Sequence, residues 1–254
     1  MTLIIRNRYT ACLLHFLISL FVFSTFVLIL LNFWYPQPFF TASGGLQGLK
    51  LVAAIDLVLG PALTLIVYNI NKSKKELFTD FSIIAFIQIT ALCWGVFTVY
   101  NQRPVAAVFW ENGFYTVPAS ALENRGISLK KLDKYGSKKP VYIFAAQPQS
   151  DKDREQMINA ILEEHIPPYQ QLDRFKPVEQ HYNDIYKHSV DILKIISKNS
   201  DMKDEIDAVL TKSGTSLNDN HYITLISKYR NIILIFNQNN QIIGTASAPF
   251  KNKN

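Results

Sequence analysis

Residues 11 to 34 read ACLLHFLISLFVFSTFVLILLNFW, an almost unbroken apolar run. At a rise of about 1.5 Å per residue, about 20 helical residues cross the roughly 30 Å hydrocarbon core of a bilayer. A cleavable signal peptide is the alternative, but its apolar core has only about 7 to 15 residues and a small-residue cleavage site follows it. The run therefore predicts an uncleaved transmembrane helix, with Trp34 and Tyr35 in the interfacial aromatic belt.

Two more apolar stretches, at about 49–70 and 81–99, predict a second and a third transmembrane helix. Basic residues precede the first helix at Arg6 and Arg8, and they lie between the second and the third at Lys72, Lys74 and Lys75. The loop 35–48 carries no charge. Because positively charged loops stay in the cytoplasm, we expect a cytoplasmic N-terminus and a multi-pass protein of the bacterial inner membrane. Everything after Tyr100 would then lie in the periplasm of a Gram-negative cell.

Charge divides the 254 residues into two regions, which we expect to be a three-helix transmembrane region, 1–104, and a periplasmic domain, 105–254. The first region holds seven Lys and Arg and three Asp and Glu, and the second holds nineteen and seventeen. The net charge of +6 comes largely from residues beside the apolar segments, so a nucleic-acid partner is not expected. Cys12 and Cys93 both fall in apolar segments, so the domain needs a core of its own.

The second region has strands, then helices, then strands, a pattern that predicts an α+β fold with an antiparallel sheet. The expected strands are 105–110, 114–118, 141–146, 222–228, 232–237 and 241–245, and an Asn-Gly pair marks the first hairpin. The expected helices begin at the cap Ser150, at Pro177 and at the cap Ser200, and they end before Pro167, near Lys198 and near Lys212.

Polar residues within the predicted transmembrane helices are candidates for function, because an ionisable side chain costs roughly 2.5 to 3.5 kcal/mol there. Asp56 lies one turn before Gly60-Pro61, and Pro61 should kink the helix and leave the Leu57 carbonyl without its usual donor. The candidates on the small and polar faces are Asp56, Gly60, Pro61, Thr64, Gln88 and Gly95. Either these faces pack together, or part of this surface receives a helix of another protein.

Four motifs follow one another along the membrane region: Trp34-Tyr35-Pro36, DLVLGPALTL at 56–65, Gln88 and Arg103-Pro104. In these motifs the chain resembles the type IV pilin accessory proteins of the TfpX/TfpZ group. The resemblance implies an inner-membrane protein that binds a cognate major type IV pilin and aids its stabilisation or its delivery to the pilus assembly machinery. The alternative is a membrane-anchored periplasmic ligand-sensing receptor that acts through a separate signalling partner.

The hydrophilic region contains no phosphate loop, no nucleophile elbow and no zinc-protease helix motif. We therefore expect no enzyme activity, no cofactor and no metal. His181, Asp184 and His188 would share one helical face and could hold a metal ion, but a solvated face is the better interpretation.

Overall fold

The computed structural model describes residues 7–69 and 71–248, so Arg6 and Ile70 lie outside the described residues. The chain divides into two compact units. The first comprises Met1–Phe40 and Gly44–Asn101, and the second comprises Thr41–Ser43 and Gln102–Asn254. A short piece of the loop after the first helix thus belongs to the second unit.

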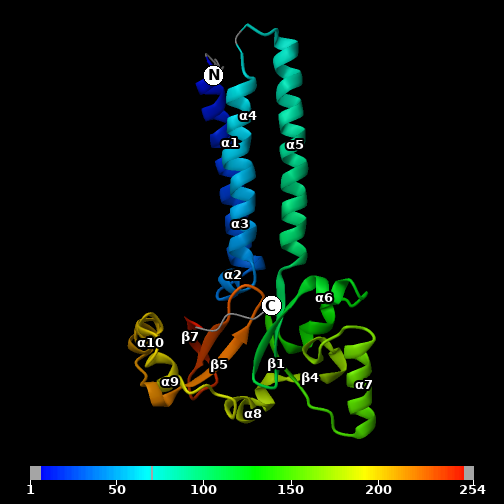
Figure 1. Ribbon diagram of the computed structural model, residues 1–254, viewed down its shortest axis with the longest axis vertical. Helices are drawn as coiled ribbons and strands as arrows, with labels where there is room; N and C mark the ends of the chain where they lie inside the picture. Colours follow the sequence, from blue (N-terminus) through cyan, green and yellow to red (C-terminus); the bar gives the residue numbers. More distant parts are fainter. Residues whose placement is uncertain (1–6, 70, 249–254) are drawn as a thin grey trace. The chain divides into compact units, whose positions relative to one another are not determined.

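The first unit consists of three long helical segments (Figure 1). The first is α1 (Arg8–Ile29) with the π-helical turn η1 (Leu30–Trp34), and the short α2 (Phe39–Ala42) follows it. The second is α3 (Gly45–Ala53), the π-helical turn η2 (Ala54–Leu59) and α4 (Gly60–Val67), and the third is α5 (Lys74–Asn101). All three segments are long and apolar enough to cross a membrane.

The second helical segment accommodates Pro61 by a π-helical turn rather than by a break. Pro61 stands in the first turn of α4 and has no N–H to donate. On its N-terminal side the Gly60 N–H donates to the Ile55 carbonyl, five residues back, which widens the turn that contains Asp56. The expected disturbance at Pro61 therefore takes the form of an inserted residue in the helical ladder.

The second unit is built on a seven-stranded sheet with the order β4-β3-β1-β2-β5-β6-β7. The strands are β1 (Pro104–Trp110), β2 (Gly113–Pro118), β3 (Val141–Ala145), β4 (Phe175–Pro177), β5 (His221–Ile226), β6 (Ile232–Phe236) and β7 (Ile242–Ser247). The predicted hairpin and meander are present, but the predicted antiparallel sheet is wrong. The sheet is mixed, because β1 pairs with β3 and β2 with β5 in parallel. Helical connections before β3 and β5 make these parallel neighbours possible.

Helices and 3-10 turns connect the strands. The α-helices are α6 (Ala119–Glu123), α7 (Asp151–Leu162), α8 (Tyr182–Tyr186), α9 (Ile192–Ile196) and α10 (Ser200–Ser213). The 3-10 turns are η3 (Leu129–Tyr135), η4 (Pro168–Gln170), η5 (Leu172–Arg174), η6 (Val178–Gln180) and η7 (Leu217–Asp219). The Ser150 side chain accepts the Asp153 N–H at the start of α7, as predicted. The cap of α10 is Asn199 and not Ser200.

The predicted continuous helix over 177–198 is wrong. The segment forms η6, α8 and α9 with an extended stretch between α8 and α9. In that stretch the Val190 N–H donates to the Tyr222 carbonyl at the start of β5, and the Asp191 side chain then caps α9. The Val190 N–H therefore pairs with the sheet, whereas in a continuous helix it would donate to a carbonyl of the preceding turn.

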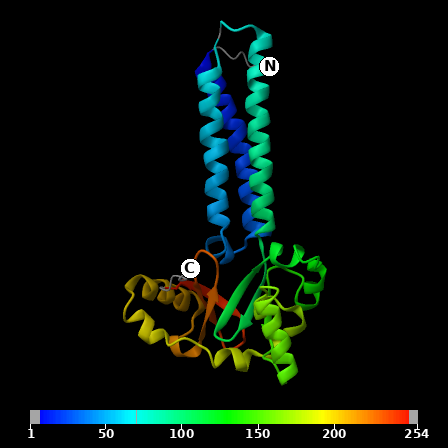
Figure 2. The same ribbon diagram turned by 45° about the vertical axis from the view of Figure 1, so that its right-hand side comes forward.

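One face of the sheet carries two separate hydrophobic cores, and helices cover them on either half (Figure 2). The first core includes Val108, Val117, Ile143 and Phe175 under α6 and the 3-10 turns. The second joins Ile233 and Ile235 of β6 to Ile206 and Leu210 of α10, and α9 contributes Ile192. The middle of this face, over β2 and β5, lies between the two covers.

The segment Thr41–Ser43 is bonded to the turn between β5 and β6. The Ala42 carbonyl accepts the N–H groups of Tyr229 and Arg230 at 3.1 and 3.3 Å. The Ser43 hydroxyl lies 2.8 Å from the Ser227 hydroxyl, which in turn donates to Thr116 Oγ1 at 2.9 Å. Residues far apart in the sequence therefore share one row of hydroxyl groups.

Candidate functional site

A polar cluster lies between the three helices of the first unit, and each helix contributes one member. His15 of α1 places Nδ1 2.5 Å from Oγ1 of Thr64 on α4. The Gln88 side chain of α5 lies beside the same ring. The Gln88 amide lies directly against Gly60. It fills the space that a Cβ on residue 60 would take. Hydrogen bonds between helices of this kind hold apolar helices together.

The six candidate residues on the small and polar faces are all buried inside the first unit. Asp56, Thr64 and Gln88 are 4%, 1% and 9% exposed, and Gly60, Pro61 and Gly95 are also buried. A Cβ added at Gly95 would lie 3.6 Å from a γ-carbon of Val52 on α3, which is an ordinary contact distance. This placement fits the interpretation that the faces pack against each other, and contact with a helix of another protein stays a proposal.

Asp56 differs from the other members because one of its carboxyl oxygens is unsatisfied. Within the described residues, Oδ2 of Asp56 is buried and has no hydrogen-bond partner. The residue stands in the π-helical turn η2, and such turns occur frequently at functional sites. A buried carboxyl group without a partner costs stability, so it invites a functional explanation.

His15 is the member of this cluster that is not among the candidates predicted from the sequence. The available signal was weak: an imidazole near one end of the first helix and Thr64 near the matching end of an antiparallel second helix. Asn32, another polar residue of the first helical segment, donates to the Leu28 carbonyl of its own segment at 2.8 Å.

The family-like motif positions make structural contacts. Trp34 packs edge-on against Tyr100, and the buried Tyr35 hydroxyl donates to the Val99 carbonyl at 2.9 Å. The Pro36 carbonyl accepts the Phe39 N–H. In the second unit, Arg103 accepts the Ala119 N–H with its carbonyl, and Pro104 opens β1. Tyr35 is therefore an internal contact of the helices rather than an exposed interfacial residue.

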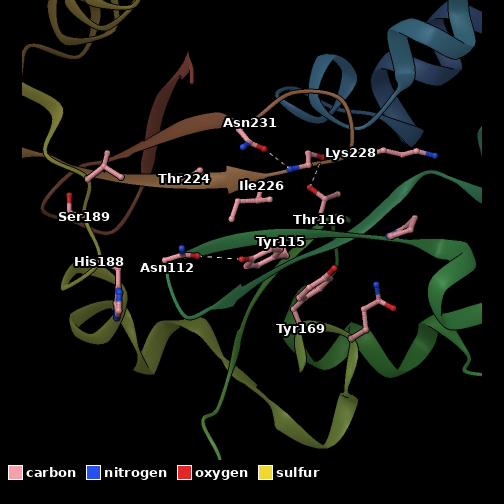
Figure 3. Close-up of a pocket in the computed structure, with 14 residues that line it drawn as sticks. Asn112, Tyr115, Thr116, Tyr169, His188, Ser189, Thr224, Ile226, Lys228 and Asn231 are labelled. Atoms are coloured by element: carbon pink, nitrogen blue, oxygen red, sulfur yellow. Dashed lines mark hydrogen bonds between the residues drawn. The ribbon is translucent and has the colours of Figure 1, made fainter. Parts of the chain in front are cut away.

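A groove of about 950 Å³ opens in the second unit, over the middle of the sheet face between the two cores (Figure 3). Tyr115, Thr224 and Ile226 line it from β2 and β5, and Tyr169 and Ser189 line it from the connections on either side. The complete lining consists of Asn112, Tyr115, Thr116, Pro118, Tyr169, Gln170, His188, Ser189, Val190, Thr224, Ile226, Ser227, Lys228 and Asn231. Sequence reasoning missed the groove, because its residues are scattered over the domain.

The groove is rich in uncharged hydrogen-bonding groups, and its lining contains no carboxylate. The Tyr115 and Tyr169 rings stack with centroids 4.5 Å apart, and burial raises the pKa of both phenols. Both tyrosines therefore stay neutral at ordinary pH and can donate a hydrogen bond. The groove suits recognition of a polar ligand.

The structure separates the three residues considered for a metal site. His181 Nδ1 lies 3.5 Å from an Asp184 carboxyl oxygen, but His188 lies beyond the end of α8 and packs against the Phe109 ring. The Lys187 ammonium, followed by His181, lowers the pKa of Asp184. Over residues 7–69 and 71–248, no group of three or more His, Cys, Asp or Glu residues is placed to hold a metal ion.

The chain is similar in sequence to the fimbrial assembly protein of serogroups C1 and C2 of Dichelobacter nodosus. It is 41% identical over 96 residues, which are 38% of this chain and 73% of the relative. This chain belongs to the fimbrial assembly protein family. The family model described as fimbrial assembly protein FimB matches residues 4–44 of this fimbrial assembly protein. Membership supports a role in fimbrial biogenesis.

Two longer relatives from the same organism match over an equally long stretch. The fimbrial assembly proteins of serogroup I and serogroup E1 are 41% and 40% identical over 96 residues. The matched stretch is 37% of each of these relatives, so the chain spans little more than a third of their length. No solved structure matches the chain.

Proposed function

We propose that this fimbrial assembly protein is an inner-membrane accessory of the TfpX/TfpZ type that binds a cognate type IV pilin. It stabilises the pilin or delivers it to the pilus assembly machinery. The observation that carries the proposal is the 41% identity to a fimbrial assembly protein over most of that relative's length, in a chain with three helices long enough to span a bilayer.

The proposed topology follows from the charges beside the helices. Arg8 precedes the first helix and Lys72, Lys74 and Lys75 lie between the second and the third, whereas the loop 35–48 is uncharged. The three helices would therefore lie in the inner membrane with the N-terminus in the cytoplasm and the sheet domain in the periplasm. Pilin and domain would then meet on the same side of the membrane.

The proposed membrane contact lies near Asp56. Its unpartnered oxygen can accept a hydrogen bond, and Asp56 stands in the π-helical turn η2, a kind of turn that is frequent at functional sites. Leu57 on the same turn is half-buried and Ile89 on α5 is exposed, so both side chains can touch an incoming helix. A pilin helix that brings a donor to Asp56 would satisfy the carboxyl group.

The proposal is tested by photo-crosslinking in living cells that express the pilin. A photo-reactive residue replaces Leu57 or Ile89, and a control variant carries it at Phe21, an apolar and exposed position on α1. Capture of the major pilin at Leu57 and Ile89 supports the proposal. Capture of a signalling kinase instead, with no pilin at any position, would favour the ligand-sensing receptor.

The role of Asp56 is tested separately by Asp56→Asn and Asp56→Ala. Asn keeps an acceptor and most of the shape, whereas Ala removes both. We expect a lower pilin level and fewer pili with Ala than with Asn. If both variants leave pilin level and piliation unchanged, Asp56 has no part in pilin binding.

A further inference from the structure

The groove over β2 and β5 exists because the pairing of these strands is short. They pair in parallel only from Gly113 with Thr224 to Tyr115 with Ile226. The 3-10 turn η4 stands at one wall, where Tyr169 packs on Tyr115, and Ser189 stands at the other. The sheet face between these walls carries no helix, so β5 forms the floor of an open channel.

The channel follows the direction of β5, as Figure 3 shows from Ser189 to Lys228. The Ser189 hydroxyl accepts the Tyr222 N–H, so this end of the channel lies beside residue 222 of β5. From there to its end at Ile226 the strand advances four residues, which at about 3.3 Å per residue is roughly 13 Å, and Lys228 follows in the turn. An extended peptide of about four residues has the same length as this part of the strand.

The polar groups along the channel are suited to the peptide backbone. The Thr224 hydroxyl, the Tyr169 hydroxyl and the Gln170 side-chain amide make no hydrogen bond within the described part of the chain. They can therefore bind backbone N–H and C=O groups of a ligand. His188 and Lys228 stand at the two ends, and the lining has no acidic residue, so an uncharged or acidic segment fits better than a basic one.

Backbone hydrogen bonds already close both ends of β5. The Val190 N–H donates to the Tyr222 carbonyl near the start of the strand, and the Ala42 carbonyl accepts the N–H groups of Tyr229 and Arg230 in the turn beyond its end. A peptide in the channel would lie between these two contacts, on the sheet face.

We propose that the channel holds an extended, uncharged or acidic segment of the pilin's extramembrane part, about four residues of which lie along β5. This inference rests on the proposed function, because it takes the pilin as the partner. It adds a second contact, in the sheet domain, to the contact proposed for the helices. Two contacts on one partner raise selectivity, because a pilin must match both.

The test uses the full-length protein in detergent micelles and fluorescein-labelled, overlapping ten-residue peptides that cover the extramembrane part of the cognate pilin. Fluorescence anisotropy measures their binding. We expect one contiguous set of peptides to bind. The double variant Thr224→Val with Tyr169→Phe keeps shape and apolar packing but removes two hydroxyl groups, so it should weaken binding about fivefold or more. Gln170→Trp should block the channel and abolish binding.

The control variant is Thr245→Val. Thr245 lies on β7 opposite Leu234, which places its side chain on the other face of the sheet, whereas Thr224 is opposite Ile233 on the channel face. Its affinity for the peptides should equal that of the unchanged protein. Equal binding by all variants, or binding of no peptide, would overturn the channel proposal while crosslinking of pilin at Leu57 and Ile89 still supported the proposed function. Absence of pilin from every crosslinking position would overturn both.

Discussion

The side-chain amide of Gln88 occupies the space that a Cβ on residue 60 would need, so Gly60 and Gln88 fill one volume between α4 and α5. Gly60→Ala should therefore overpack this contact and destabilise the first unit by about 1 to 3 kcal/mol. Gln88→Ala in the same chain should restore much of the loss. Thermal unfolding of the purified protein in detergent, followed by circular dichroism, measures both effects.

Gly95→Ala is the matched control for that prediction. An added Cβ at Gly95 would lie 3.6 Å from Val52, an ordinary contact distance, and Ala is favoured over Gly within a helix by roughly 1 kcal/mol. We expect the unfolding temperature of Gly95→Ala to equal or exceed that of the unchanged protein. Equal losses at both glycines would contradict the Gly60–Gln88 contact.

Thr64 should be needed for its hydroxyl group, because that hydroxyl pairs with the buried His15 ring. Thr64→Val keeps the shape but leaves the imidazole nitrogen without this partner. We expect a loss of about 0.6 to 1.7 kcal/mol, the range for hydrogen bonds between membrane helices. Thr64→Ser should retain most of the stability. The same thermal unfolding experiment decides the matter, and indistinguishable Val and Ser variants would argue against the hydrogen bond.

Acid should weaken the second unit partly through Asp153. The Gln149 N–H, followed by the buried Arg174 guanidinium, lowers the pKa of Asp153 in the folded chain. In the unfolded chain the Asp153 carboxyl has an ordinary pKa of about 3.9, so as the pH falls the unfolded chain takes up a proton there before the folded chain does. The stabilisation is therefore present above about pH 4 and is lost as the pH falls through the folded-state value. Urea unfolding at several pH values measures the free energy of unfolding of the unchanged protein and of Asp153→Asn. The difference between them should shrink as the pH falls below about 4. A difference that stays constant with pH would contradict the role of Asp153.

The packing of α10 on β7 depends on the absence of a side chain at Gly244. A Cβ there would collide with both γ-carbons of Val209. Gly244→Ala should destabilise the second unit by about 1 to 3 kcal/mol, and Val209→Ala should relieve the collision in the double variant. Urea unfolding measures the coupling between the two positions. Additive effects of the two substitutions would show that the residues do not touch.

Local patterns of the sequence were sufficient for the helices of the first unit and for the hairpin and meander of the second. The parallel pairing of β1 with β3 and of β2 with β5 could not be predicted, because no local pattern states which distant strands become neighbours. The three-residue β4 ends in Pro177 and has no alternation to detect. The break between α8 and α9 depends on the Val190–Tyr222 hydrogen bond, a contact outside the segment itself.

The candidate sites divide in the same way. Asp56, Gly60 and Gln88 were predicted because polar and small residues are conspicuous in apolar helices. The partnership of His15 with Thr64 depends on how the helices are rotated against each other, which sequence spacing does not give. The channel over β5 depends on where two helical covers stop, and its residues are spread from Asn112 to Asn231.

The membership of Thr41–Ser43 in the second unit has a consequence for biosynthesis. These residues leave the ribosome early, whereas Tyr229 and Arg230, whose amides bond to Ala42, are among the last parts of the domain to be translated. The contact between Ala42 and the turn at Tyr229 and Arg230 can therefore form only after nearly the whole chain has been synthesised. A fragment that begins at Gln102 would lack Thr41–Ser43 and would expose the amides of Tyr229 and Arg230 to water.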